Sequence, residues 1–455
     1  MKAHVSTPPA VSRQQLHAMT GVYAVLLLLG LETTLGGAIL PQAAQTLNGI
    51  ELFGWLGTFQ MLAAACMTPV TARLGDIWRR KWLVFASVVL LIVAGTIAAA
   101  ATSMEVLLAS RIINGIAIGM MAGAAFAVPV DVFSDPSQRV RWQSLSGVMF
   151  AVSSSMGPIL GALLIELFGW RFALLAVPVA CLPVLCVLLS MPDMQPRQAS
   201  KQRFDLPGAV YLSLFIGSSL FGLQSLGKSQ SAAGYLLVAV LSLYLFWGQQ
   251  RRAEQPILAL EILQNLQVKL IALSTLVSGA VLSVLLFYSP LLLTTLTGMS
   301  FRDAGLAMLP MLIGMPTGSV INGFLFRKLS RPRMLFCVGA VTLFCGMAIL
   351  VFIPYGLPIS GLMAGYALCG LGLGFINQNQ SVFIQIVTPR QFAGAATGLV
   401  STVRSYGGAL GSAALSLALL TAGLHQGLII GLLISLGCAL LVIPITVRIF
   451  LDESA

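Results

Sequence analysis

Hydrophobic positions form long continuous runs along this chain, separated by short polar segments. Runs of about 20 apolar residues can cross a bilayer as helices, whereas the strands of a membrane β-barrel would alternate over shorter segments. The pattern therefore predicts an all-α polytopic membrane protein with fourteen transmembrane helices. The predicted spans cover residues 20–40, 53–72, 82–102, 105–128, 144–165, 172–191, 207–226, 232–248, 270–293, 304–325, 334–353, 357–380, 394–420 and 427–449.

Composition and charge placement support this class. Hydrophobic residues make up 58% of the 455 residues and charged residues 9%, with a mean hydropathy of +0.94. With the N-terminus inside and fourteen spans, most of the 25 Lys and Arg residues fall on the cytoplasmic side, as membrane proteins favour. Only Arg171, Lys228 and Arg302 fall outside. We therefore predict that both termini are cytoplasmic, and we interpret the net charge of +11 as a topology signal rather than a nucleic-acid footprint.

The chain also repeats itself. A shift of about 250 residues places Gly119 and Gly123 on Gly370 and Gly374, and the segment 157–161 on 407–411. The period is long enough for two helices beyond a six-helix unit, so we expect an arrangement of six, two and six. The predicted parts are an N-terminal six-helix bundle (1–191), a linker with two extra spans (192–268) and a C-terminal six-helix bundle (269–455).

Other features narrow the function. All seven cysteines lie in apolar runs and are expected to pack there, and no metal-ligand spacing is present. The first 17 residues show no removable signal peptide. No nucleotide-binding loop appears, so ATP-driven pumping and enzymatic activity are not expected.

Glu32 is the most informative single residue. It lies roughly 20 Å from the cytoplasmic end of the first predicted span at 1.5 Å per residue. An ionised carboxylate at that depth is costly unless it is paired, hydrated or protonated. Glu32 is therefore a candidate proton carrier, and the alternative is a static hydrogen-bonded pair.

Arg111 is a second buried charge, in the string Arg111-Ile-Ile-Asn114-Gly115. Gly119 and Gly123 follow at four-residue steps, which gives a smooth helix stripe that a neighbour can approach closely. Arg111 is about six residues from the outer end of the fourth predicted span, at a depth not far from that of Glu32.

Two further segments carry recognisable patterns. The turn Ala72–Lys81 is short, basic and flanked by apolar runs, and it contains Gly75, Asp76 and Arg80. The predicted fifth span contains Gly157-Pro158-Ile-Leu-Gly161, in which proline bends the helix and glycine permits tight packing.

These patterns resemble the major facilitator superfamily, and in particular its fourteen-span drug/proton antiporters. Leu74, Gly75, Asp76 and Arg80 match motif A, Arg111 opens motif B, and segment 157–162 matches motif C except that Ala162 replaces a glycine. The family usually has Asp where Glu32 stands.

The resemblance implies roles for these segments. Motif B would make Arg111 part of proton coupling together with Glu32, and structural pairing alone remains the alternative. Motif A would form a conformational lock of Gly75, Asp76, Arg80 and Asp131. Motif C, with Gly157, Pro158 and Gly161, marks exporters. Parallel repeats of this kind are typical of major facilitator halves.

Polar residues in the predicted helices are candidates to line a substrate cavity, although amides in membrane helices often just bond neighbouring helices. The candidates are Thr58, Gln60, Asn114, Tyr288, Asn377, Gln380 and Arg404.

The leading hypothesis is export of amphipathic small molecules or drugs, driven by a proton gradient and without a cofactor. The resemblance implies multidrug efflux, antibiotic resistance, and a monomer in the bacterial inner membrane whose partners are substrate, protons and the lipid bilayer. The alternatives are a dedicated exporter of a metabolite or siderophore, an uptake symporter, and a transport-inactive sensor or scaffold.

Overall fold

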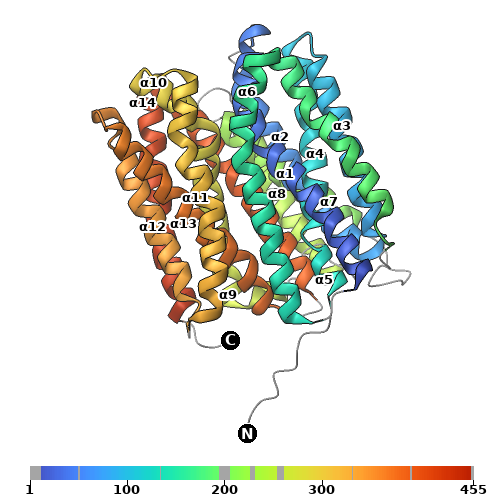
Figure 1. Cartoon of the computed structure of the whole chain (residues 1–455). Coiled ribbons are helices and arrows are strands. Elements are labelled where there is room, and N and C mark those ends of the chain that lie inside the picture. Colours follow the sequence, from blue (N-terminus) through green and yellow to red (C-terminus); the bar gives the residue numbers. More distant parts are fainter. Residues whose placement is uncertain are drawn as a thin grey trace.

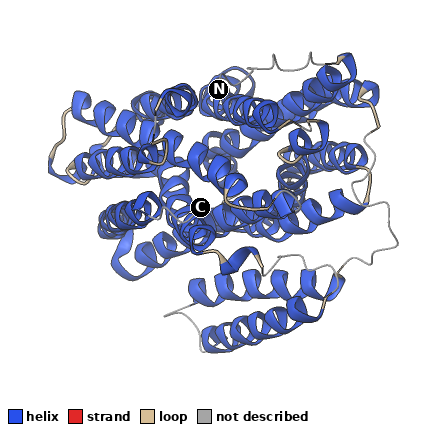
Figure 2. Cartoon of the chain, turned by 90° about the horizontal axis from the view of Figure 1, so that it is seen from below, coloured by secondary structure: helices blue, strands red, loops and turns tan. Residues whose placement is uncertain are grey.

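The computed structural model describes residues 12–49, 52–133, 135–193, 205–225, 231–253, 261–329, 331–389 and 392–451. Every element in these ranges is helical (Figure 2). The α-helices are α1 (Arg13–Thr46), α2 (Phe53–Ile77), α3 (Arg80–Ala99), α4 (Met104–Ala125), α5 (Val128–Val132), α6 (Pro136–Ser190), α7 (Leu206–Ser225), α8 (Ser231–Arg252), α9 (Leu266–Ser283), α10 (Ser289–Thr297), α11 (Phe301–Lys328), α12 (Met334–Leu350), α13 (Ile359–Ile386) and α14 (Ala393–Leu451). A π-helical turn, η3 (Val284–Tyr288), joins α9 to α10.

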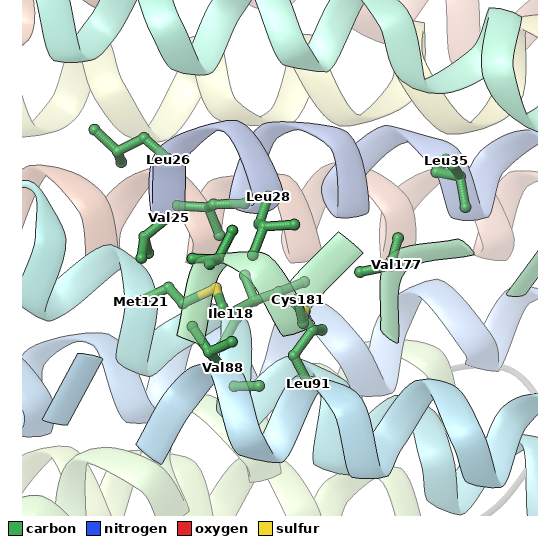
Figure 3. Close-up of a cluster of buried hydrophobic side chains, with 14 of the residues drawn as sticks. Val25, Leu26, Leu28, Leu35, Val88, Leu91, Ile118, Met121, Val177 and Cys181 are labelled. Carbon is green, nitrogen blue, oxygen red and sulfur yellow. The ribbon is translucent and has the colours of Figure 1, made fainter. Parts of the chain in front are cut away.

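Figure 1 shows two groups of helices side by side, α1 to α6 on one side and α10 to α14 on the other. Within the first group, the core is formed by apolar side chains of α1, α3, α4 and α6 (Figure 3). Leu28, Leu91, Ile118 and Cys181 each come from a different one of these helices and gather in this cluster. A second cluster, contributed by α9 to α14, forms the core of the other group.

Two glycines divide the longest helices. Gly169 in α6 and Gly423 in α14 each have a φ of 78°, a backbone conformation that favours glycine. Two contacts show that the chain turns back at Gly169. Lys81, at the start of α3, donates to the carbonyl of Leu189 near the end of α6. Its neighbour Arg80 pairs with Asp131, which lies just before the start of α6. Each long helix therefore contains two consecutive segments.

The prediction of fourteen spans is not confirmed. Twelve helices among the described residues are long and apolar enough to cross a membrane, so the protein is a multi-pass membrane protein. The predicted spans 53–72 and 394–420, which fall in α2 and in the part of α14 before Gly423, are not among the twelve. The physical reason is composition, since both segments carry polar residues such as Gln60 and Arg404 among their apolar ones.

Glycine contacts repeat between the two groups, as the sequence repeat predicts. A side chain added at Gly119 of α4 would come within 2.7 Å of the Ala64 carbonyl oxygen of α2. One added at Gly374 of α13 would collide with the Met315 carbonyl of α11. The predicted close approach along the glycine stripe is thereby confirmed, and the two helix pairs pack in the same way.

Helices α7 and α8 pack against each other at the edge of the bundle. Ile216 and Leu220 of α7 lie against Ala65 of α2 and Ala409 of α14, so α7 covers the line where these two helices meet. The outer face of α8 is apolar, with Leu237 70% and Tyr244 76% exposed. Such a surface suits contact with lipid, and the expected position of these helices outside the core is observed.

Candidate functional site

A cavity of about 170 Å³ lies between the two groups of helices. Its wall is largely apolar, with Met61, Phe150 and Phe287 among its members. Polar groups come from Thr33 and Thr34 of α1, Gln60 of α2, Ser154 of α6 and Ser283 of α9, and the cation Arg404 comes from α14. An apolar chamber with a few convergent polar groups is typical of sites for small molecules.

Arg404 is the charged member of this wall. Its Nη2 donates to the side-chain oxygen of Gln380 at 3.4 Å, and the amide nitrogen of Gln380 donates in turn to the hydroxyls of Ser274 and Ser278. Gly279 of α9 lets the Arg404 backbone approach closely, because a side chain there would come within 3.2 Å of the Arg404 Cα. The guanidinium is thus held where α9, α13 and α14 meet.

Glu32 lies in the interior of the first group and is not among the described residues lining the central cavity, although its neighbours Thr33 and Thr34 are. Its side chain accepts a hydrogen bond from Asn114 Nδ2 at 2.7 Å, and Arg111 Nη1 lies 3.7 Å from the same oxygen. Glu32 is 6% and Arg111 1% exposed. The structure thus places both predicted proton-coupling residues together with Asn114.

This buried trio is incompletely bonded. Within the described part of the chain, Arg111 Nε and Nη1 and Asn114 Oδ1 have no hydrogen-bond partner. Buried polar groups are normally paired, so unpaired ones require an explanation. The arrangement leaves bonding capacity for water or for a proton on Glu32.

The motif C segment fits α6 against α1, the helix that carries Glu32. Thr34 donates to the Ser154 carbonyl at 2.8 Å across this contact. A side chain at Gly157 would meet the backbone nitrogen of Leu35 at 2.9 Å, and one at Gly161 would meet the Cβ of Ala38 at 2.9 Å. The Pro158 side chain lies outside the described residues.

The motif A segment lies at one end of the bundle, where α6 both begins and ends. Arg80 is 3% exposed, and its Nε lies 2.8 Å from Asp131 Oδ2 of α5. Gly75 permits this path, because a Cβ there would come within 3.0 Å of the guanidinium carbon. Asp76 lies on α2, but its side chain is outside the described residues.

The predicted cavity residues occupy several environments. Gln60 and Arg404 line the central cavity, whereas Thr58 and Tyr288 line a smaller one of about 30 Å³ nearby. Tyr288 shares a hydrogen bond of 3.2 Å with Ser416. Asn114 bonds Glu32 and Gln380 supports Arg404, while Asn377 is on α13 and lines neither cavity.

Sequence reasoning missed two features of these sites. Asp193 pairs with Arg79 at 2.7 Å and anchors the motif A turn to the end of α6. Most of the cavity wall is apolar and looks like ordinary membrane-helix sequence, so no residue type distinguishes it. Asp193 could have been found from the sequence, because it is the acidic residue directly after the predicted span 172–191.

Comparison with known proteins gives one family. The profile of the Major Facilitator Superfamily matches residues 22–412. Multidrug resistance protein 3 of Bacillus subtilis is 25% identical over 86% of this chain and 77% of its own length. Multidrug transporter protein MdtP of the same organism is 24% identical over 87% and 74%. The structure of the human organic anion transporter MFSD10 superposes with a TM-score of 0.68 at 18% identity, covering 97% of this chain and all of that one.

Proposed function

Because the chain belongs to the Major Facilitator Superfamily and is a transporter rather than an enzyme, we propose that it exports amphipathic small molecules from the cytoplasm in exchange for protons. Two of its relatives are named for multidrug resistance or multidrug transport. The largely apolar cavity between the two groups of helices supports an amphipathic substrate. The resemblance of segment 157–162 to the exporter motif supports the outward direction.

One observation carries the proton coupling, namely the buried trio of Glu32, Asn114 and Arg111. A carboxylate within a membrane helix is expensive when charged, and it alternates easily between a charged form beside a cation and a protonated form. Helix α1 connects the two sites, since Thr33 and Thr34 reach the cavity directly after Glu32. Protonation of Glu32 would weaken its pairing with Arg111 and allow α1 to shift against the cavity.

We also propose fourteen spans in the order six, two and six, with boundaries at 191/192 and 268/269, both termini cytoplasmic and a location in the bacterial inner membrane. Helix α2 and the part of α14 before Gly423 pack inside the bundle against α4 and α9, and each contributes to the cavity wall. A helix that is surrounded by other helices and by a cavity has little contact with lipid, and so needs fewer apolar residues to cross a bilayer. This accounts for their lower hydropathy.

The motif A cluster is proposed as a lock between conformations. The pair of Arg80 and Asp131 lies at the end of α2, whose Ala72 approaches Gly398 of α14. Separation of the two groups at this end would break that contact. None of the cluster residues is among the described residues lining the central cavity, so the cluster is expected to govern rates rather than binding.

A transport assay in liposomes tests the proposal. Purified protein is reconstituted, an acid interior is imposed, and uptake of cationic, neutral and anionic amphipathic dyes is followed by fluorescence. At least one dye is expected to accumulate against its gradient, and nigericin, which collapses the pH gradient, is expected to abolish this. Protein-free vesicles give the background. Dye movement that never exceeds equilibration, with or without the gradient, would contradict proton-driven export.

A further inference from the structure

The charges inside the helices do not balance. One acidic residue, Glu32, and two basic residues, Arg111 and Arg404, lie deep in the described helices. Glu32 lies beside Arg111, which leaves Arg404 as an additional positive charge. Between Glu261 and Asp452 the only acidic residue is Asp303, which is exposed at the start of α11, so the interior of the second group of helices has no acid to neutralise it.

Arg404 is moreover only partly bonded. Among the described residues its one acceptor is Gln380 Oε1 at 3.4 Å, a long hydrogen bond, and its Nε is buried without a partner. No described carboxylate forms an ion pair with it. An arginine guanidinium has five N–H donors in a planar fork that matches a carboxylate, so most of this capacity remains available.

Arg404 is part of the cavity wall. Arg404 lines the central chamber together with Gln60 from the opposite group of helices, and the remaining wall is apolar apart from hydroxyls and backbone. No acidic residue is among the described residues of this wall. A ligand in the chamber would therefore meet an uncompensated cation, one amide and apolar side chains.

We propose that the central cavity binds amphipathic monoanions, in which a carboxylate or comparable acidic group pairs with Arg404 and an apolar body fills the chamber. This substrate class rests on the proposed transport function. Uncompensated charge in a membrane interior marks a substrate pathway. The anion would supply the charge that the helices around Arg404 lack.

Binding to detergent-purified protein without any proton gradient tests the substrate class separately from export. The probes are 2-naphthoate, 2-naphthamide and 2-naphthylmethylamine, which share one apolar body and differ in charge, measured by calorimetry at pH 7. The wild type is expected to bind the carboxylate about tenfold or more tightly than the amide and the amine, in line with the strength of charge-assisted pairing. Equal binding, tighter binding of the amine, or no binding of the carboxylate would overturn the proposal.

Variants identify the residue. Arg404→Gln is expected to remove the preference for 2-naphthoate while leaving 2-naphthamide binding unchanged, and Arg404→Lys is expected to retain part of it. Gln60→Leu is the matched control, because it alters the same wall without changing charge and should affect the three probes alike. A carboxylate preference that survives in Arg404→Gln would refute the assignment. If that variant is shown to be unfolded by its melting curve, the comparison of Arg404→Lys with the wild type decides. Failure of proton-driven export with an intact anion preference would contradict only the transport proposal.

Discussion

At the residue scale, Glu32 is the position at which a single proton has the largest expected effect. Its carboxylate accepts from Asn114 at 2.7 Å and has Arg111 3.7 Å away. Glu32→Gln keeps the shape and the acceptor oxygen but fixes the neutral state. We expect this variant to fold and to lose pH-driven transport in liposomes down to the rate of protein-free vesicles. Glu105→Gln, which changes an exposed acid at the start of α4, is the control and should transport normally.

Full pH-dependent transport by Glu32→Gln would remove this residue from the mechanism. Such a result would be informative, because the second group of helices offers no acid between Asp303 and Asp452 to replace it. Glu32 is not among the described residues of the cavity wall. Under the proposed coupling, proton and substrate would therefore affect one another through α1 rather than by competing for one set of atoms.

The partner Arg111 gives a second prediction at this scale. Lysine preserves the charge but lacks the planar fork, and a point charge does not replace the donors that surround Glu32 and Asn114. Arg111→Lys is expected to reduce pH-driven transport further than Glu32→Asp, which only shortens the carboxylate's reach. Initial rates of both variants in the same liposome assay check this order. Equal rates would show that the geometry of the guanidinium is unimportant.

Removal of the carboxylate should also cost stability. Glu32→Leu would leave Arg111 buried without its counter-charge, and breaking a buried ion pair in this way destabilises proteins by about 3–5 kcal/mol. We expect Glu32→Leu to melt at a lower temperature than the wild type, and Glu32→Gln to lie between the two because its amide oxygen still accepts from Asn114. Thermal unfolding in detergent, followed by tryptophan fluorescence, compares the three proteins, and equal melting temperatures of Glu32→Leu and the wild type would argue against a stabilising pair.

At the element scale, the packing of α6 on α1 determines where Glu32 and the cavity threonines lie. Gly157→Ala introduces a methyl group that would meet Thr34 and the Leu35 backbone nitrogen. Overpacking of this kind typically costs about 1–3 kcal/mol. We expect a lower melting temperature and slower transport. Gly437→Ala is the matched control, because the space around Gly437 in α14 is open, and it should behave like the wild type.

Much of this element-level architecture follows from the sequence. Continuous apolar runs mark the membrane helices, and the spacing of Gly119 and Gly123 predicts a close helix contact that α2 makes. The division of α6 at Gly169 agrees with the boundary predicted between residues 165 and 172. The number of spans does not follow as directly, because the segments 53–72 and 394–420, which contribute to the cavity wall, are not among the twelve described helices that are apolar enough to cross a membrane.

The site was less accessible to sequence reasoning. Charged residues in apolar runs identify Glu32, Arg111 and Arg404, because burial of a charge is rare enough to be informative on its own. Amide side chains often form hydrogen bonds between neighbouring membrane helices. The sequence alone therefore could not distinguish Gln60, which lines the cavity, from Gln380, which accepts a hydrogen bond from Arg404. Which side of a helix faces a neighbour is decided by tertiary packing.

At the scale of the whole molecule, motif A is expected to set the balance between conformations. Asp131→Asn removes the carboxylate beside Arg80 while keeping the size of the side chain. We expect slower transport with unchanged affinity for a transported dye, since neither Arg80 nor Asp131 lines the cavity. Binding in detergent and initial rates in liposomes separate these effects, and Glu166→Gln, an exposed acid on α6, is the control. Loss of binding by a folded Asp131→Asn protein would contradict the lock.

The number of membrane crossings is the last property of the whole molecule that can be tested directly. Reporter fusions after Asn48, Arg302 and His425 are expected outside, and those after Arg141, Arg203 and Arg333 inside, if all fourteen segments cross. Should α2 not cross, the fusion at Arg141 would report the outside, and the basic turn at Arg79–Lys81 would also lie outside, against the preference of basic residues for the cytoplasm. Should the first part of α14 alone fail to cross, His425 would report the inside. Because each alternative changes a different fusion, the pattern identifies which of the two cavity-lining segments spans the bilayer.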